Sequence, residues 1–336
     1  MPQTNLSTTS STESVTLSPL SKDFVRLQAH LNQRIIGQPE LTEGLLIALL
    51  ADGHLLVEGA PGLAKTKAIK ELSAAVEGSE HRIQFTPDLL PADLTGTEIY
   101  HLEDGSFRFQ KGPIFHSFVL ADEINRAPAK VQSALLEAMA ERQVTVGSES
   151  HPLPEVFLVM ATQNPIEQEG TYPLPEAQLD RFLMHLRIKS PDAAAEHLIL
   201  KLVRAEAQHE VQEKFIPLTQ IAVRAARQEA LNIFLSPALE EYLVQLVMAT
   251  RNPGQYDADL ARWIEWGASP RGTISLDRCA RVRAWLRGRS FVTPEDVQAV
   301  VHDVLRHRVL TTYEAEAEGV TPDMILDRIL QLVPLP

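Results

Sequence analysis

The chain has 336 residues, long enough for two domains with a sizeable core, and 44% of them are hydrophobic, as is usual for a globular protein. Its formal charge of -13 argues against a general nucleic-acid-binding protein. The single cysteine, Cys279, excludes a disulfide framework or a cysteine-based metal site within one chain and fits a reducing compartment.

The first twenty residues are rich in Ser and Thr and have neither a basic start nor an apolar core. This composition predicts a disordered tail over residues 1–20 rather than a secretory signal. The best apolar run, Leu45–Ala51, is much too short to span a membrane. We therefore expect a cytoplasmic protein without a membrane span.

Residues 21–191 alternate short apolar runs with helical patterns. Apolar strands separated by helices form mainly parallel sheets that are covered on both faces. We therefore expect an α/β core with five buried strands. The runs are Leu55–Val57, Ile83–Phe85, Phe118–Ala121, Val156–Ala161 and Phe182–Ile188.

Two hairpins are expected to interrupt this alternation, because turn residues separate two pairs of short strand patterns. The strands and turns are Glu98–His101, Asp104-Gly105 and Ser106–Phe109 in the first, and Gln143–Val146, Gly147-Ser148 and the residues around His151 in the second.

After Ser190-Pro191 the pattern changes to long stretches with helical periodicity. Several of these stretches begin with good capping residues, such as Ser236 before Pro237. We place a domain boundary there and expect residues 192–336 to form an all-helical lid domain. The predicted helices are Ala193–Glu210, Ile221–Ala230, Pro237–Thr250, Ile274–Leu286 and Pro294–Leu305.

Residues 54–66 combine a short apolar strand, a loop with glycine and proline, and the start of a helical pattern. A phosphate-binding loop needs this context, because its backbone N–H groups and the helix start together attract phosphate oxygens. Lys65 would reach the β- and γ-phosphates of a nucleotide, and the Thr66 hydroxyl would bind Mg²⁺. The alternative is an ordinary strand–turn–helix whose lysine faces solvent. The loop residues expected to contact nucleotide are Gly59, Ala60, Pro61, Gly62, Leu63 and Ala64.

Ala64 departs from the usual pattern of such loops, which have glycine before the lysine. Alanine is the smallest residue with a Cβ, so we expect the loop to tolerate it if this position is already helical. Gly59 and Gly62 supply backbone angles that other residues resist.

Residues 117–123 form an apolar strand that ends in two carboxylates, Asp122 and Glu123. Buried carboxylates are unfavourable unless they are paired or bound to metal. Beside a phosphate loop, Asp122 would hold the Mg²⁺ shell, partly through water, and Glu123 would orient and polarise the attacking water. The alternative of two solvated acids at a strand end is disfavoured by the phosphate loop about 55 residues upstream.

A second strand pattern, Val156–Ala161, leads into Thr162-Gln163-Asn164-Pro165. An amide at a strand end beside the acidic pair can hydrogen-bond both the γ-phosphate and the attacking water. Asn164 is the candidate for this role, although Asn-Pro is also a common start of a turn.

These segments occur together with three others: Phe85–Pro91, Leu174–Phe182 and Gly267–Arg271. The combination, with Asp122–Ala127 and Ala161–Glu167, resembles the MoxR family of AAA+ ATPases. The resemblance runs from about Leu20 to the C-terminus, and the combination is highly specific although no single segment is. The alanine before the lysine, Ala64, also fits the resemblance, because the family is similar at this position.

The resemblance implies a P-loop NTPase core of the AAA+ type, with a five-stranded sheet, hairpin insertions and a helical lid. ATP with Mg²⁺ would bind between core and lid, and the working form would be a homo-oligomeric ring, expected to be a hexamer. The two hairpins would reach toward a pore or a substrate.

The resemblance also implies roles for individual residues. Asn164 would be the first sensor, and Arg181 would be an arginine finger that acts on the nucleotide of the neighbouring subunit. Arg271 would be the second sensor, touching the γ-phosphate in cis. Ile36 and Gly37 would contact adenine. A cation at the transferred phosphoryl group raises the rate by roughly 10³–10⁵, so a finger from a neighbour makes turnover depend on assembly.

The arginines each have an alternative. Arg181 could pair with Asp180 or Glu176, and Arg271 could face solvent at a helix start. Arg142 is a second finger candidate, but it could equally be a cation at a helix C-terminus.

Two further features each allow two interpretations. Gln84 could hold Glu123 inactive until substrate arrives, or be a plain polar residue at a strand end. A basic stretch in the lid could contact DNA, but the acidic chain favours a solvated face that meets acidic neighbours. Its members are Arg271, Arg278, Arg281, Arg283, Arg287 and Arg289.

The sequence therefore predicts an ATPase that couples ATP–Mg²⁺ hydrolysis in a ring to the remodelling, maturation or cofactor loading of a client protein. By resemblance, a partner with a von Willebrand factor A domain is expected, and nucleic acid is not. The alternatives are a nucleotide-gated scaffold with slow turnover and a DNA-acting AAA+ protein.

Overall fold

A five-stranded parallel sheet lies at the centre of the molecule in the computed structural model, which describes residues 18–103, 105–147, 149–165, 170–208 and 215–336. The strand order is β2-β5-β8-β1-β9, and all four neighbouring pairs are parallel. The strands are β1 (Leu55–Glu58), β2 (Glu80–Gln84), β5 (Phe118–Asp122), β8 (Leu158–Gln163) and β9 (Met184–Arg187). The predicted α/β fold with five strands is confirmed.

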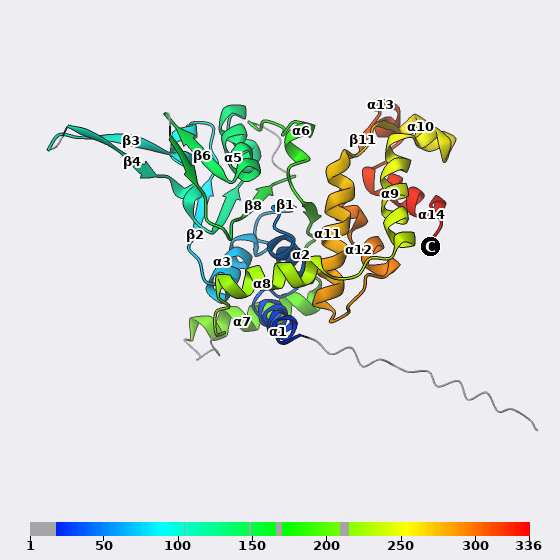
Figure 1. The fold of residues 1–336 in the computed structure, drawn as a ribbon, viewed down its shortest axis with the longest axis horizontal. Coiled ribbons are helices and arrows are strands. Elements are labelled where there is room, and N and C mark those ends of the chain that lie inside the picture. The colour runs from blue at the N-terminus through cyan, green and yellow to red at the C-terminus, as the bar shows by residue number, and fades with distance from the viewer. Residues whose placement is uncertain (1–17, 104, 148, 166–169, 209–214) are drawn as a thin grey trace, which may run out of the picture.

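Successive side chains of each strand enter two separate cores, as the period of two in a strand requires. Leu55 and Val57 of β1 face one core, whereas Leu56 faces the other. Helices α1 (Pro19–Arg34), α2 (Pro39–Leu50) and α3 (Lys65–Ala75) cover the first core, and α5 (Ala129–Glu141) covers the second. Figure 1 shows α5 above the sheet and α1, α2 and α3 below it.

Both predicted hairpins are present. They are formed by β3 (Gly96–His101) with β4 (Ser106–Lys111), and by β6 (Gln143–Val146) with β7 (Glu149–Pro152). Asp104 and Ser148 of their turns lie outside the described residues. The β3–β4 hairpin extends far from the body of the molecule (Figure 1), and its Tyr100 and Phe107 side chains are largely exposed.

Short helical segments connect several of these strands. They are α4 (Pro91–Thr95), η1 (Pro113–Phe115), η2 (Ile124–Arg126) and α6 (Glu176–Leu179).

The chain beyond residue 191 is mainly helical, as predicted. Among the described residues, the sequence patterns missed three shorter α-helices, one 3-10 helix and a two-stranded antiparallel pair. Glu210, the predicted end of the first helix, lies outside the described residues. The elements are α7 (Ala193–Ala207), α8 (Gln220–Leu231), α9 (Pro237–Arg251), η3 (Pro253–Gln255), α10 (Ala258–Trp263), β10 (Ile264–Trp266), α11 (Pro270–Leu286), α12 (Pro294–Leu305), β11 (Leu310–Thr311), α13 (Tyr313–Ala317) and α14 (Pro322–Leu332).

Helix α8 belongs spatially to the core layer. Its Arg227 forms an ion pair of 2.8 Å with Asp52, just before β1, and donates to the carbonyl of Leu49. In Figure 1, α7 and α8 lie beside α1, whereas α9 to α14 form a separate group at the right. The predicted domain boundary after residue 191 therefore stays a prediction, because α8 follows this point in the chain but packs against the core.

The described residues begin at Ser18, inside the predicted tail of residues 1–20, and residues 1–17 of that tail lie outside them. Helix α1 begins at Pro19, and the Ser18 side chain caps it by accepting from the backbone N–H of Ser21 at 3.0 Å. Ser18 also donates to Glu229 of α8 at 2.6 Å. Pro19 and Leu20 therefore belong to the helix, because a serine cap followed by proline at the first turn is a strong helix start.

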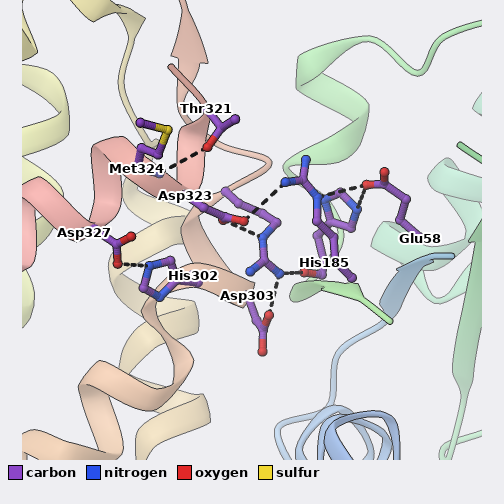
Figure 2. Close-up of polar contacts among 10 residues, drawn as sticks. Glu58, His185, His302, Asp303, Thr321, Asp323, Met324 and Asp327 are labelled. Atoms are coloured by element: carbon purple, nitrogen blue, oxygen red, sulfur yellow. Dashed lines mark hydrogen bonds and ion pairs between the residues drawn. The ribbon is translucent and has the colours of Figure 1, made fainter. Parts of the chain in front are cut away.

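Ion pairs connect the end of β1 with the lid helices (Figure 2). Oε2 of Glu58, the last residue of β1, lies 3.0 Å from Nε2 of His185 and 3.1 Å from Nε of Arg187. Arg187 also lies 3.3 Å from Asp323 on α14, and Arg306 binds the other oxygen of that carboxylate at 2.9 Å. Hydrogen bonding to His185, with the charge of Arg187, lowers the pKa of Glu58 to about 2.

The basic stretch of the lid is largely neutralised within the chain. Arg283 lies 2.8 Å from Asp296, and Arg289 lies 2.6 Å from the same carboxylate, which has no exposed surface. Arg287 pairs with Glu43 of α2 at 2.6 Å. This pairing removes most of the positive surface that DNA would require. Within the described part of the chain, no helix is long and apolar enough to cross a membrane.

Asp296 also caps α12, where it accepts from the backbone N–H of Thr293 at 3.0 Å. Asp296→Ala leaves the partly buried guanidinium of Arg289 without its carboxylate and takes from Arg283 the nearer of two, the other being Glu43 at 3.4 Å. The free energy of unfolding should therefore fall by about 3–5 kcal/mol in urea titrations. The matched control is Asp259→Ala, because Asp259 forms an exposed pair of 3.6 Å with Arg262 and should contribute less than about 1 kcal/mol. Equal losses in the two variants would contradict the structural role of Asp296.

Candidate functional site

The predicted phosphate loop connects β1 to α3, as the sequence indicates. Gly62 has φ +85°, and a Cβ at Gly59 would lie 2.4 Å from Cγ1 of Ile188, so a side chain is excluded there. The helix begins at Lys65, and its first N–H groups are available at the loop. The segment from Gly59 to Thr66 thus has the strand, turn and helix start that bind phosphate.

Ala64 has a left-handed backbone, with φ +58° and ψ 16°. The condition under which we expected alanine to be tolerated, a helical position 64, is not met, because the loop turns through the left-handed region where glycine is the favoured residue. An alanine in this conformation is disfavoured by about 1–2 kcal/mol. The loop therefore stores local strain directly before Lys65.

Lys65 lies over the loop, where its Nζ donates to the Gly59 carbonyl at 2.6 Å. Partial burial lowers its pKa, and the nearby Asp122 and Glu123 charges oppose that shift. The lysine is thus close to the acidic pair and is held by a backbone carbonyl, a contact that incoming phosphate oxygens can replace.

Ile36 and Gly37 lie next to the segment that follows β9. Gly37 has φ +78°, and a Cβ there would lie 3.0 Å from the side chains of Pro191 and Ala195. The Gln38 side chain donates to the Lys189 carbonyl at 2.8 Å. Because Gly59 packs on Ile188 of the same segment, the candidate adenine contact and the phosphate loop converge on residues 188–195.

Asp122 ends strand β5 beside this loop. Its Oδ1 accepts from the hydroxyl of Thr162 at 2.6 Å, and its Oδ2 accepts from Nε and Nη2 of Arg82 at 3.0 and 2.6 Å. The side chain is 13% exposed. The carboxylate is therefore fixed on one side by a hydroxyl and neutralised on the other by a guanidinium.

Glu123 follows in a left-handed conformation, with φ +58° and ψ 50°. Its backbone N–H donates to the Thr162 hydroxyl at 2.9 Å. Its Oε2 accepts from Gln84 at 2.8 Å and from Arg126 at 3.0 Å. Gln84 thus contacts Glu123, as one of its two sequence interpretations required, and one carboxylate oxygen is occupied by two donors.

Asn164 follows β8, the strand that pairs with both β1 and β5, and it is 6% exposed. It therefore lies at the edge that also carries the phosphate loop and the acidic pair. Thr162 was not among the predicted site residues, although it stands in the same sequence segment. Its hydroxyl joins Asp122 to the backbone of Glu123, which only the pairing of β5 with β8 could reveal.

A magnesium ion fits the oxygen donors at this edge. The Thr66 hydroxyl and the Asp122 carboxylate are the hard ligands that Mg²⁺ prefers, with water and phosphate completing its shell. The guanidinium of Arg82 already places a positive charge on Asp122, which shows that this carboxylate accepts a cation. The residues present therefore suit the metal.

The predicted arginines gather at the opposite edge of the sheet, where the strands begin. A cavity of about 320 Å³ is lined there by residues that precede β1 and β9 and by the first turns of α11. Its lining includes Asp52, Arg142, Asp180, Arg181, Arg271, Arg278 and Arg308. We call this the arginine cavity.

Arg181 donates one bond, to the carbonyl of Leu136 at 2.6 Å. Arg142 is more heavily engaged, because it binds Asp52 at 2.7 Å and the carbonyls of Asp52 and Phe157 at 3.1 Å. These contacts fit Arg142 as a structural cation at the end of α5, the second of its two interpretations. Arg181 makes fewer contacts within the described residues and is therefore the better candidate for a finger.

Arg271 does not lie near the phosphate loop of its own chain, so the predicted cis contact is not supported. Its Nη1 lies 3.9 Å from Asp180, beside Arg181 in the arginine cavity. The four residues of β1, at about 3.3 Å each, separate this edge from Gly59. The reason is the placement of α11, which begins next to α6 rather than over the loop (Figure 1).

Arg308 was also missed from the sequence, because nothing in its local pattern distinguishes it. Its side chain is 2% exposed and donates to Asp180 at 2.8 Å and to the carbonyls of Phe182 and Leu183 at 2.6 and 3.2 Å. It thereby fixes the segment that carries Arg181. Burial of this guanidinium is tolerated because Asp180 balances its charge and the two carbonyls accept from its N–H groups.

The left-handed Ala64 gives a direct test of the loop. Ala64→Gly should raise the free energy of unfolding by about 0.5–1 kcal/mol, because the released strain exceeds the added entropy of the unfolded chain. The matched control is Ala74→Gly at an exposed helical position of α3, which should lower it by about 1 kcal/mol. A loss of stability in both variants would show that Ala64 is not strained.

Thr162 can be tested by removing only its hydroxyl. In Thr162→Val, kcat for the predicted ATP hydrolysis should fall about 10- to 100-fold with little change in KM, because a hydrogen bond to a charged group contributes about 1.5–3 kcal/mol. Thr162→Ser keeps the hydroxyl and should retain most of the rate. A valine variant as fast as the parent would exclude the positioning role.

The comparisons with known proteins agree with this geometry. Residues 54–184 match the family model of the ATPase family associated with various cellular activities (AAA), and residues 258–329 match the AAA lid domain. The chain is 48% identical to "Chaperone MoxR1" of Mycobacterium tuberculosis over 90% of its own length and 79% of that protein. It is 35% identical to "Protein MoxR" of Methylorubrum extorquens over 93% and 94% of the two chains.

A solved structure shows the same architecture. The crystal structure of a candidate ATPase from Cytophaga hutchinsonii superimposes with a TM-score of 0.87 at 44% identity, covering 94% of this chain and 96% of that one. A relative that is nearly half identical over most of both chains shares the fold and the family. The chain therefore belongs to the MoxR family of AAA+ ATPases.

Proposed function

We propose that this ATPase hydrolyses ATP with Mg²⁺ at the interfaces of a closed ring, expected to be a hexamer, and uses the cycle to remodel a client protein. Remodelling here includes maturation of the client or insertion of a cofactor into it. The name "Chaperone MoxR1" of the 48% identical relative supports a client, and the family resemblance supports a partner with a von Willebrand factor A domain.

The observation that supports the ring is that the two parts of the site lie at opposite edges of one parallel sheet. Lys65, Asp122 and Glu123 lie at the edge where strands end, and the arginine cavity lies where strands begin. A protomer cannot bring these edges together. Head-to-tail association does so, and such contacts form a ring when they close.

In this proposal, each residue acts on a nucleotide shared by two chains. Lys65 and the loop N–H groups bind the phosphates, Thr66 and Asp122 hold Mg²⁺, which neutralises phosphate charge, and Asn164 hydrogen-bonds the γ-phosphate. Glu123 orients the attacking water. Arg181 and Arg271 come from the neighbouring chain, so the second sensor acts in trans. Ile36 and Gly37 contact adenine.

The isolated protomer should turn over slowly. Its Glu123 carboxylate is held by Gln84 and Arg126, and its own Arg181 lies at the far edge of the sheet. Assembly supplies the arginine, and a change at the β2 end must free the carboxylate. A DNA-acting protein is disfavoured, because the lid arginines are paired with Glu43, Asp277 and Asp296.

Complementation between inactive variants tests the shared site. Arg181→Ala should keep ATP affinity but lose about 10³-fold in turnover, and Lys65→Ala should lose ATP binding. In a 1:1 mixture of the two, about a quarter of the interfaces pair an intact loop with an intact finger, so about a quarter of the parent rate should return. Steady-state phosphate release measures this recovered rate. A mixture of Arg271→Ala with Lys65→Ala should recover turnover to the same extent.

The control mixes Lys65→Ala with the double variant Lys65→Ala/Arg181→Ala, which offers no intact loop and should stay inactive. Light scattering on the same samples reports whether rings form. Rings that form in the first mixture without any recovered turnover would contradict an arginine acting in trans.

A further inference from the structure

None of the roles described above requires Arg82, yet its side chain contacts Asp122 of the acidic pair and Gln84, which in turn contacts Glu123. Its Nη2 donates to Oδ2 of Asp122 at 2.6 Å and to Oε1 of Gln84 at 2.7 Å, and its Nε donates to the same Asp122 oxygen at 3.0 Å. In the register of β2 with β5, Gln84 stands opposite Asp122 and Arg82 opposite Leu120. Arg82 and Gln84 are two residues apart and therefore share one face of the sheet.

These contacts complete a closed circuit of hydrogen bonds. Arg82 binds Asp122 and Gln84, Gln84 binds Oε2 of Glu123 at 2.8 Å, and the backbone of Glu123 returns through Thr162 to Asp122. The metal-binding carboxylate and the water-orienting carboxylate are thus linked twice. One link is the buried Thr162, and the other is the Arg82–Gln84 pair at the surface.

We propose that Arg82 is a positioning residue that occupies Asp122 in place of Mg²⁺ in the nucleotide-free protomer and couples arrival of the metal to release of Glu123. The inference rests on the proposed function, since it assumes that ATP with Mg²⁺ binds at this edge. The guanidinium uses two donors on Oδ2, the oxygen that is not bound by Thr162. Two cations cannot share this oxygen, because like charges at contact distance repel strongly.

The release step follows from the shared Nη2 group. When Arg82 leaves Asp122, its Nη2 no longer fixes Oε1 of Gln84, and the Gln84 amide is free to rotate away from Glu123. Oε2 of Glu123 then has one lone pair available for a water. No covalent bond changes in this step.

The exposure of the side chains allows such a movement. The Arg82 side chain is 49% exposed, whereas that of Asp122 is 13% exposed. The guanidinium can therefore turn into solvent without leaving a buried charge unpaired, while the carboxylate stays in place to meet the metal. The Thr162 link keeps Asp122 and the Glu123 backbone fixed throughout.

The proposal separates two properties of Arg82, its charge and its fork of donors. Lysine has the charge but is a point cation without a planar fork, so it can pair with Asp122 without holding Gln84 as well. Arg82→Lys should therefore keep the competition with Mg²⁺ and lose the hold on Glu123. Arg82→Ala should lose both.

The first experiment measures binding rather than turnover. Calorimetry gives the affinity for the β,γ-imido analogue of ATP with and without Mg²⁺, and the ratio of the two affinities reports how strongly the site favours the metal. This ratio should rise about three- to tenfold in Arg82→Ala and stay near the parent value in Arg82→Lys. Arg26→Ala is the matched control, because Arg26 is exposed and pairs only with Asp23 at 3.5 Å among the contacts of the described residues.

The second experiment measures client-free ATP hydrolysis at saturating Mg²⁺. Both Arg82→Ala and Arg82→Lys should raise it about two- to tenfold, and Arg26→Ala should not change it. An unchanged or lower affinity ratio in Arg82→Ala, or unchanged hydrolysis in both variants, would overturn the inference. A parent protein that does not bind the analogue with Mg²⁺ at all would instead overturn the proposed function.

Discussion

All five strands of the sheet point in the same direction, and the chemistry of the molecule depends on this constraint. In a parallel sheet, the segments that follow the strands all lie at one edge, and the segments that precede the strands all lie at the opposite edge. The phosphate loop, Asp122, Glu123 and Asn164 follow their strands, whereas Arg181 precedes one. The separation of the two groups is thus built into the topology, and no side-chain movement within a protomer can remove it.

The same constraint explains how much of the site could be predicted from the sequence. The apolar runs and their polar ends fix which residues reach the carboxyl edge, so Lys65, Thr66, Asp122 and Glu123 could be grouped from spacing. Thr162 and Arg82 could not, because their roles depend on which strands are neighbours and in what register. For a related reason, helical periodicity predicted a helix over Ile274–Leu286 but not that α11 begins beside α6, where Arg271 lies 3.9 Å from Asp180.

Several buried or half-buried charged side chains are neutralised by an opposite charge at hydrogen-bond distance. Asp296 neutralises two arginines of the lid, Arg308 holds Asp180, and Arg82 neutralises Asp122. Buried or half-buried ions are tolerable because each has a partner at hydrogen-bond distance. The acidic net charge of the chain therefore coexists with a basic cavity, whose Arg271 is 53% exposed and available to a neighbour.

The apolar core runs without a break from the first face of the sheet into the lid, with Leu55 and Val57 in the same cluster as Val297 and Ile329. Arg187 adds a polar connection across the same junction, because it forms ion pairs with both Glu58 and Asp323. Because a movement of the lid would expose close-packed hydrocarbon to water, we expect the core and the lid to move together as one rigid body. In the ring that we propose, mechanical work is then expected from neighbouring chains that rotate against one another as rigid bodies, with a nucleotide bound between each pair.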